Sequence, residues 1–358
     1  MTTKEQFIKN TKKKLAIMPP IVQNFYSYRI SSGMQPSTMY TTISNLHQFF
    51  DWYLTTSPTS EIEQIQDFTL ESIAQITAEQ IQEYITEMLS TPMQTTGKLI
   101  GKNTINTRIM TLRGFFRWLT VESTDPNNQP YSYLTYNPMA KIKFKVGEAT
   151  LNAKANAINQ KIFDGERKFD FLEWLRLEYK PSLSPQARKL FEQTEQRNYA
   201  IFSLLVASGL RVTELVNINL TDLDQENHLI NHVVRKGDHE DVVKYAGWAE
   251  PYLQDWLIER QLRFGQDEHA ALFLSTSRQQ VYRISQSQVE RMVKKLTKAY
   301  GRETTPHKLR HTFGTELYRA TNSVVDVQQA LGQTTDSATK IYIHADQQRR
   351  NQAIEELE

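Results

Sequence analysis

Apolar residues recur at helical spacing throughout the first 145 residues of the chain. Between residues 37 and 54 they return every three or four positions, which predicts an amphipathic helix. A capping-box pair, Thr77 and Gln80, predicts the start of a second helix, and Asn103 is expected to cap a third. The amino-terminal part is therefore expected to be a compact helical domain that ends near residue 145.

The pattern changes after residue 145. Residues 196–208 predict a strongly apolar helix, with Gly209 at the position of a left-handed cap. Apolar residues on both sides of Lys236-Gly237-Asp238 predict a hairpin over residues 232–243. Further helices are expected over residues 251–264, 285–300, 306–320, 324–331 and 337–342. These elements predict a mainly α protein with one small antiparallel β-sheet and two domains, 1–145 and 146–358.

Composition excludes several classes of protein. The 358 residues contain no cysteine, so disulfides, thiolate metal sites and cysteine nucleophiles are ruled out. The longest apolar stretch, residues 200–210, is too short for a membrane span of about 20 residues. The lysines within residues 1–14 are not followed by the apolar core of a secretory signal. The chain is therefore expected to be cytoplasmic and to have no membrane partner.

The net charge of +2 conceals an uneven distribution of charge. Residues 98–145 hold eight basic residues but only two acidic ones, Glu122 and Asp125. Such an excess suits a polyanion such as a DNA backbone, although a solvated basic face is an open alternative. The helix predicted over residues 285–300 adds a second basic group. The DNA-binding candidates are Lys102, Arg108, Arg113, Arg117, Lys141, Lys143, Lys145, Arg291, Lys294 and Lys295.

The segment that follows Asn137 and Pro138 is expected to be an extended connector. Its three lysines occupy alternate positions from residue 141 to residue 145, so they share one side of the extended chain. Such a strap can lie along a charged surface. Arg113 and Arg117, four residues apart on a predicted helix, can likewise reach phosphates together.

Motifs that would indicate other chemistry are absent. The sequence has no G-x-x-x-x-G-K-[ST] loop for ATP, no H-E-x-x-H zinc motif and no G-x-G-x-x-G turn after a strand. Its acidic residues are scattered rather than grouped as in a metal nuclease. The sequence therefore predicts an activity that uses no metal and no cofactor, although spacing alone leaves a carboxylate–metal site open.

Residues 305–314 predict a helix that begins with a threonine cap and a proline. His307 and Arg310 fall on one face of that helix, close to its amino-terminal end. Free backbone N–H groups and the helix dipole make such an end a favourable phosphate site. On its own the motif is weak, because a solvated basic face gives the same pattern.

Three further elements carry candidate catalytic side chains. Arg211 follows a glycine turn directly behind a buried helix, so its position is fixed, and Glu214 can orient its guanidinium. Lys236 is placed at the predicted hairpin tip, and Tyr342 follows a glycine-containing turn near the carboxyl end. Each has an ordinary alternative: a surface Arg–Glu pair, a turn lysine, and a core or surface tyrosine.

Taken together and in order, these elements resemble the tyrosine recombinase family. The segments SGLRVTEL, HKLRHTF and ATKIYIH are similar to that family's motifs, and ALG precedes the tyrosine. The amino-terminal helices are similar to its SAM-like core-binding domain. The two-domain layout is most similar to Xer recombinases, and the long segment 163–195 suggests the XerS-like form that acts without a partner paralogue.

The chain departs from many Xer proteins at one position. Those proteins carry histidine after the Leu-Gly pair, whereas this chain has Gln333. Glutamine can donate a hydrogen bond to a phosphate oxygen but carries no charge. Gln333 therefore stays among the catalytic candidates as an uncharged donor.

The resemblance implies DNA strand transfer through a covalent intermediate. Arg211 and Arg310 would clamp the phosphate oxygens, and both side chains are expected to point into a solvent-filled cleft. Tyr342 would be the nucleophile, His307 its base and Lys236 the acid that protonates the leaving 5′ oxygen. The resulting 3′-phosphotyrosyl bond keeps the energy of the phosphodiester, so neither ATP nor a metal ion is required.

The resemblance also implies partners. The expected substrate is double-stranded DNA with an inverted-repeat recombination site. A homotetramer is expected to assemble on it through exchange of the carboxyl-terminal tail, residues 345–358. The expected role is resolution of chromosome dimers at a dif-like site, with a septal DNA translocase of the FtsK type as a further partner. A phage or mobile-element integrase and a catalytically silent DNA-binding protein are the alternatives.

Overall fold

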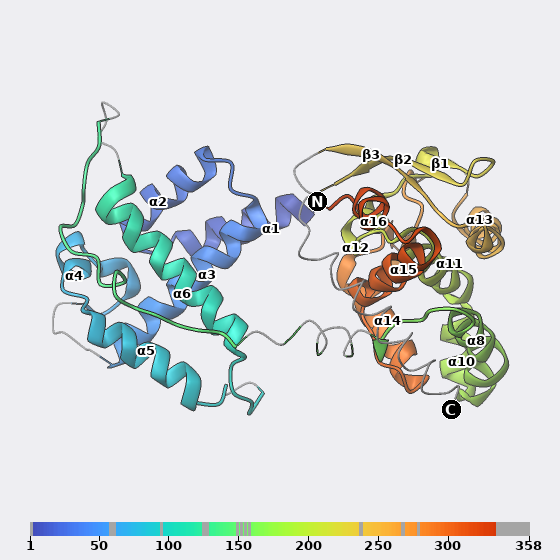
Figure 1. The fold of residues 1–358 in the computed structure, drawn as a ribbon, viewed down its shortest axis with the longest axis horizontal. Coiled ribbons are helices and arrows are strands. Elements are labelled where there is room, and N and C mark those ends of the chain that lie inside the picture. The colour runs from blue at the N-terminus through green and yellow to red at the C-terminus, as the bar shows by residue number, and fades with distance from the viewer. Residues whose placement is uncertain are drawn as a thin grey trace. The chain divides into compact units, whose positions relative to one another are not determined.

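The computed structural model describes residues 3–56, 62–93, 96–123, 129–147, 150, 153, 156, 159–235, 239–265, 269–277 and 280–333. Contacts divide the chain into two compact units, Met1–Glu148 and Ala149–Glu358 (Figure 1). This division falls three residues from the boundary expected at residue 145. Lys236, Tyr342, the helix expected over residues 337–342 and the tail 345–358 lie outside the described residues. No helix within the described ranges is long and apolar enough to cross a membrane.

The amino-terminal unit is helical. It contains α1 (Thr3–Leu15), α2 (Pro20–Ser31), α3 (Pro36–Thr56), α4 (Leu70–Ala74), α5 (Ala78–Ser90) and α6 (Lys102–Arg117). α3 packs against α1, α2 and α6, and α5 packs against α6. In the core the rings of Phe25 and Phe50 both contact Phe115, with centroids 5.3 and 6.3 Å apart. The periodic apolar residues of the sequence therefore supply the core, as an amphipathic pattern predicts.

Capping residues predict two helix starts in this unit, and the structure confirms one of them. Gln80 N donates to Thr77 Oγ1, and Thr77 N donates to Gln80 Oε1 (2.9 Å), so the capping box of α5 is present. The prediction for Asn103 is wrong, because α6 starts at Lys102 with Gly101 as its cap. Glycine is itself a favourable cap residue, and its position two residues earlier leaves Asn103 inside the first turn.

The connector at the end of the unit shows the predicted alternation. Lys141, Lys143 and Lys145 are exposed, whereas Ile142 between the first two is buried. Arg113 of α6 donates from Nη2 to the Ile142 carbonyl (3.0 Å), which ties the connector to the helix. The three lysines therefore face solvent from a backbone that is held in place.

The carboxyl-terminal unit is built around α11 (Glu195–Ser208), which is buried from Asn198 to Ser208. Its other helices are α8 (Arg167–Trp174), α9 (Lys180–Ser182), α10 (Pro185–Glu192), α12 (Val212–Asn217), α13 (Glu250–Phe264), α14 (Gln286–Ala299), α15 (Pro306–Thr321) and α16 (Val324–Leu331). α8, α13, α14 and α15 all pack against α11, which explains why it is apolar on every side (Figure 1).

Gly209 ends α11 in the left-handed conformation that the sequence predicts, with φ at 63°. A Cβ at this position would lie 2.5 Å from Phe313 Cδ1 and 2.8 Å from Leu331 Cδ2. Glycine is therefore required for the backbone turn and also for close contact with α15 and α16. This contact fixes the start of α12, where Arg211 is found.

Two small antiparallel sheets complete the unit. β1 (Leu223–Asp224), β2 (Leu229–Val234) and β3 (Glu240–Lys244) form the first, and β2 with β3 is the predicted hairpin. β4 (Leu274–Ser277) and β5 (Gln280–Arg283) form a second sheet that the sequence does not predict. Four residues are too few for alternation to distinguish a strand from a loop. The mainly α class is confirmed, and the single sheet is corrected to two.

The charged segment 163–195 packs against α15. Lys168 Nζ pairs with Glu316 of that helix (2.6 Å), and Arg319 of the same helix pairs with Asp164 (2.7 Å). Both pairs are largely shielded from solvent. The segment therefore stabilises the position of α15, the helix that carries two of the catalytic candidates.

Candidate active site

A groove of about 630 Å³ opens on the carboxyl-terminal unit. It lies between the first turn of α12, one face of α14 and the start of α15. Arg211, His307 and Arg310 line it together, although Arg211 is far from the other two in the sequence. The fold thus brings the start of α12 and the start of α15 together, whereas the order of the motifs in the sequence only suggests that they are close.

The start of α15 has the predicted architecture. Thr305 Oγ1 accepts a hydrogen bond from Lys308 N (3.4 Å), and Pro306 is the first helical residue. The backbone N–H groups of a first helical turn lack partners within the helix and give this end a partial positive charge. Both Thr305 and His307 line the groove, so this helix end is suited to a phosphate.

Arg310 does not point into a solvent-filled cleft, which corrects the expectation for this side chain. It is only 3% exposed, whereas the side chain of Arg211 is 31% exposed. Arg310 Nη1 donates to the Gly209 carbonyl (2.5 Å), and Nη2 donates to the Leu331 carbonyl. Because α15 packs against both α11 and α16, the face that carries Arg310 is turned toward the ends of those helices.

One buried carboxylate, Glu214, joins the arginines of the site. Its side chain is 2% exposed, and it accepts from Arg211 Nη1 (2.6 Å) and from the Arg211 backbone N–H (2.8 Å). Its Oε2 also lies 3.2 Å from Arg235 Nη1 and 3.8 Å from Arg310 Nη1. Glu214 therefore orients Arg211, as its position in the sequence suggests, and also neutralises charge on two further guanidiniums.

Arg235 is a member of this network that sequence reasoning missed. Its side chain is 8% exposed, and Nε donates to Asp241 of β3 (3.0 Å). The sequence signal was weak, because two consecutive valines do not show which side faces inward, and only the structure shows that Val233 is buried and Val234 is exposed. The next residue, Arg235, therefore falls on the inward side, where an arginine requires partners.

The carboxyl end of α16 supplies further acceptors for the same arginines. Arg235 donates to the carbonyls of Ala330 (3.1 Å) and Leu331 (3.4 Å). Arg211 Nη2 lies 3.5 Å from the carbonyl of Gly332, the left-handed residue that ends the helix. The last carbonyls of a helix lack intrahelical partners and carry partial negative charge, so they stabilise nearby cations.

Two histidines stand at the start of α15, with ring centroids 4.8 Å apart. Desolvation by the surrounding protein, followed by the charges of Lys308, Arg310 and Arg211, lowers the pKa of His307. Burial, followed by the charges of His307, Lys308 and Arg310, lowers the pKa of His311 to about 3. Both imidazoles are therefore neutral near pH 7, and a neutral imidazole can accept a proton.

Of the three remaining catalytic candidates, the structure describes only Gln333. Gln333 follows Gly332 directly, and its backbone N–H donates to the Gln328 carbonyl (2.9 Å). Its side chain is not part of the groove lining in the described part of the chain. Lys236 and Tyr342 lie outside the described residues, and the roles of all three stay predictions.

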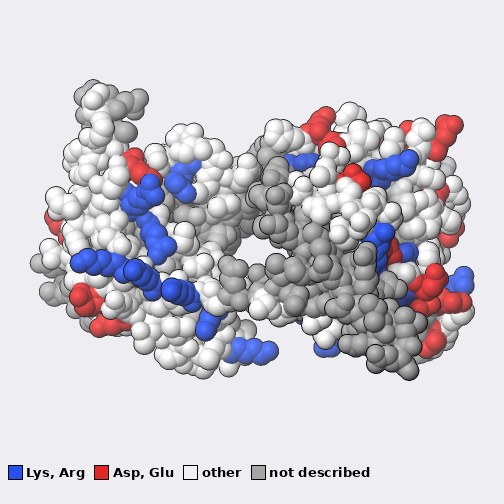
Figure 2. Space-filling model, viewed as in Figure 1, with Lys and Arg blue, Asp and Glu red and all other residues white. Residues whose placement is uncertain are grey.

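The basic candidates of the amino-terminal unit divide into two groups. Lys102 and the connector lysines are exposed, and Figure 2 shows Lys and Arg side chains gathered over α6 and the connector. The arginines of α6 have protein partners: Arg117 pairs with Glu122 (2.6 Å), and Arg108 Nη1 lies 3.5 Å from Met88 Sδ. Arg113, bound to the connector, belongs with them.

The candidates of α14 lie beside the site. Arg291 and Lys294 line the groove with Arg211, and Lys295 is exposed on the same helix. Lys294 also pairs with Glu303 (3.3 Å).

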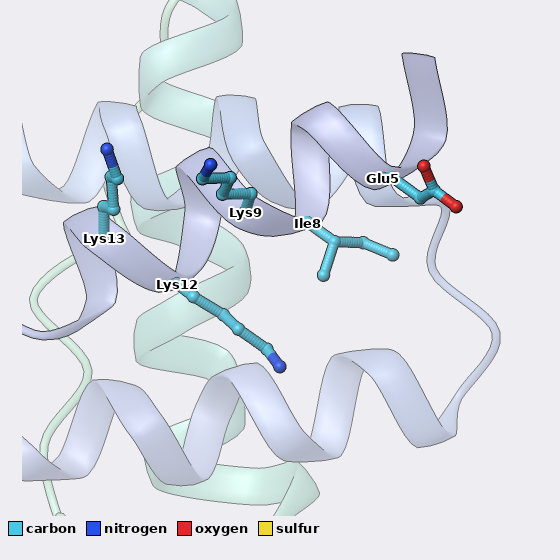
Figure 3. A pocket seen from close by; sticks show the side chains of 5 residues that line it. All are labelled: Glu5, Ile8, Lys9, Lys12 and Lys13. Atoms are coloured by element: carbon cyan, nitrogen blue, oxygen red, sulfur yellow. The ribbon is translucent and has the colours of Figure 1, made fainter. Parts of the chain in front are cut away.

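α1 carries a basic surface that is not among the predicted DNA-binding residues. Lys9, Lys12 and Lys13 are exposed and, together with Glu5 and Ile8, line a shallow hollow on this helix (Figure 3). These three lysines form the α1 lysine face. The sequence contains its signal in the run Lys12-Lys13-Lys14.

Comparisons with known proteins identify the family. The Phage integrase family matches residues 182–349. Tyrosine recombinase XerS of Lactococcus lactis subsp. cremoris is 32% identical over 358 residues, covering 99% of both chains. The chain therefore belongs to the phage integrase family of tyrosine recombinases, enzymes that cleave and rejoin DNA through a tyrosine intermediate.

Within that family the similarity to XerS extends over the whole chain. Tyrosine recombinase XerS of Streptococcus uberis is 33% identical over 358 residues, again covering 99% of each chain. Solved structures agree on the fold. That of XerH site-specific recombinase bound to difH substrate has a TM-score of 0.57 at 22% identity, covering 86% of this chain and 76% of that one. A lambda integrase dimer bound to a core site has a TM-score of 0.56 at 16% identity, covering 90% and 93%.

Proposed function

We propose that this chain is a site-specific recombinase that attacks DNA with Tyr342 and resolves chromosome dimers at a dif-like site. The observation that carries the proposal is the groove in which Arg211 and Arg310 meet the start of α15 around one buried carboxylate. Three guanidiniums share Glu214, which leaves positive charge where a phosphate would bind. The XerS relatives support a role as an Xer recombinase. The dif-like site is supported by XerH, a recombinase of similar fold whose solved structure is bound to difH substrate.

The chemistry follows from these charges. The Tyr342 oxygen attacks phosphorus, and the transition state gathers negative charge that Arg211 and Arg310 stabilise. His307, whose lowered pKa keeps it neutral, accepts the phenolic proton. The bond from phosphorus to the 5′ oxygen breaks, and Lys236 protonates that oxygen. Reversal by an incoming 5′ hydroxyl reseals the strand, so the cycle consumes no nucleotide.

Binding of the duplex involves several basic surfaces. We assign phosphate contacts to the exposed connector lysines, to the α1 lysine face and to Arg291 and Lys295 of α14. Arg108, Arg113 and Arg117 each contact a protein partner, so we assign them a secondary role in DNA contact. Phosphate contacts fix orientation but carry no sequence information, so base recognition is a separate function of these units.

The proposed assembly is a homotetramer on DNA. Each protomer donates its tail, residues 345–358, to a neighbour, which couples the state of one site to the next. A septal DNA translocase of the FtsK type is the proposed regulator, and the cytoplasm is the proposed location.

The decisive test is trapping of the covalent intermediate. A duplex with a nick beside the scissile phosphate loses the short 5′-hydroxyl fragment after cleavage, so the protein–DNA adduct accumulates and is seen on denaturing gels. Wild type should form the adduct in EDTA. Tyr342→Phe should bind the same duplex and form none, because only the nucleophilic oxygen is removed. An adduct from the phenylalanine variant would refute the assignment.

The same assay separates the alternatives. A catalytically silent DNA-binding protein would bind without any adduct from wild type. A mobile-element integrase would give the adduct, but only with sites from the element rather than with a dif-like chromosomal site.

A further inference from the structure

Arg235 links three separate elements of the carboxyl-terminal unit. From the end of β2 its guanidinium reaches Glu214 of α12 (3.2 Å), Asp241 of β3 (3.0 Å) and the Ala330 carbonyl of α16 (3.1 Å). Its backbone N–H donates to the His239 carbonyl (2.7 Å) and closes the hairpin.

We propose that Arg235 is a positioning residue for strand cleavage, an inference that rests on the proposed function above. It clamps the carboxyl end of α16 and the Glu214 carboxylate in the arrangement that lets Arg211 and Arg310 hold the scissile phosphate. Both arginines share its partners: Arg211 shares Glu214, and Arg310 shares the Leu331 carbonyl. Tyr342 lies eleven residues after Leu331 in the sequence. The same clamp therefore fixes the end of α16, from which the chain continues to the nucleophile.

The geometry requires an arginine rather than any cation. The acceptors of Arg235 surround a planar fork, which a guanidinium can satisfy and a lysine ammonium cannot. Gly332 packs closely against Arg235, because a Cβ at position 332 would lie 2.9 Å from Arg235 Nε. The side chain and the glycine thus fit one another closely.

Arg235 is a positioning residue and not a phosphate ligand. Its side chain is 8% exposed, and it is not among the described residues that line the groove. Its effect should therefore appear in the rate of cleavage and hardly in the affinity for DNA.

The test compares full-length variants at a temperature where all are folded. Arg235→Gln should lower the single-turnover cleavage rate roughly 10²-fold, the size expected when reacting groups are misplaced by about 1 Å. The affinity for a half-site duplex should change by less than about threefold, because the phosphate contacts are elsewhere. Arg235→Lys should lie between Arg235→Gln and wild type, since it keeps the charge but lacks the fork. Gly332→Ala should slow cleavage without removing any charge.

Arg260 provides the matched control. It is 2% exposed in the same unit and donates to the backbone carbonyls of Ala271 and Gly265, away from the groove. Arg260→Gln should lower the thermal midpoint as Arg235→Gln does but cleave at the wild-type rate when folded. Equal cleavage rates for the two glutamine variants would overturn the proposal.

A sulfur-substituted substrate distinguishes the clamp from the acid that follows it in the chain. When sulfur replaces the leaving 5′ oxygen, the thiolate departs without a proton. This substrate should restore cleavage by Lys236→Ala but not by Arg235→Gln. Full restoration of Arg235→Gln would mean that Arg235 acts only through the lysine and would overturn the proposal. Absence of cleavage by wild type would instead count against the proposed function itself.

Discussion

Replacement of Glu214 by glutamine tests how far one buried charge holds the site together. Glutamine has almost the same shape and can still accept one hydrogen bond. It cannot neutralise Arg211, Arg235 and Arg310, which all lie within 4 Å of the present carboxylate. The substitution therefore removes charge while leaving volume unchanged.

The expected decrease in stability follows from burial. Removal of one partner from a buried ion pair typically costs about 3–5 kcal/mol, because the remaining charge is left without compensation. Glu214 is 2% exposed and Arg235 is 8% exposed, so this range applies to their pair. In a unit of this size each kcal/mol lowers the thermal midpoint by roughly 2–4 °C. Glu214→Gln should therefore unfold at least about 6 °C below wild type.

Glu122 supplies a control, because its ion pair is as short as that of Glu214. It pairs with Arg117 at 2.6 Å, as Glu214 does with Arg211, but those side chains are 28% and 65% exposed. Solvent-exposed pairs contribute about 0–1 kcal/mol. Calorimetric unfolding should therefore show a small shift for Glu122→Gln.

Addition of a half-site duplex sharpens the test. A bound phosphate restores negative charge beside the arginines, so DNA should raise the midpoint of Glu214→Gln more than that of wild type. If the two glutamine variants melted within about 2 °C of each other, the carboxylate would not be the centre of the network, and the reasoning from burial would be refuted.

Three further predictions concern single features of the molecule. Gly209→Ala should destabilise the protein more than Gly33→Ala in urea unfolding, because both have positive φ but only Gly209 meets a wall, with a Cβ 2.5 Å from Phe313 Cδ1; equal destabilisation would contradict the packing argument. Burial first, then nearby positive charge, lowers the pKa of His311 to about 3, from about 6.5 when unfolded, so its contribution to stability is present above pH 6.5 and disappears as the pH falls toward 3. His311→Asn should flatten that pH dependence, and an unchanged slope would argue against it. Replacement of the α1 lysine face by glutamines should reduce the slope of log K against log salt by about 0.9 for each phosphate that is no longer neutralised; an unchanged slope would remove α1 from the DNA interface.

Features governed by neighbouring residues could be predicted from the sequence. The threonine cap and proline of α15, the left-handed Gly209 and the capping box of α5 each depend on a few consecutive positions, and all three are present. Asn103 shows the limit of this local reasoning. Gly101 and Asn103 are both favourable cap residues, and the glycine is the one that caps the helix.

Features governed by packing could not be predicted in the same way. A helical wheel shows that Arg310 shares a face with His307, but it does not show that the ends of α11 and α16 cover that face. Burial of Arg310 emerges only when three helices meet. Arg235 is similar, since its partners are distributed over α12, β3 and α16. Family motifs point to residues that touch substrate, whereas such a supporting residue leaves little trace in a single sequence.

The balance of charge explains why the site needs both its arginines and a buried carboxylate. A fully neutralised cluster would bind phosphate weakly, and a cluster of three buried guanidiniums without an anion would oppose folding. Glu214 and the end of α16, whose dipole amounts to roughly half a negative charge, compensate part of the total. The positive charge that remains is presented to the groove by Arg211, which is more exposed than Arg310. Removal of Glu214 should therefore damage the fold before the chemistry, whereas Arg211→Ala should leave the fold intact and abolish cleavage.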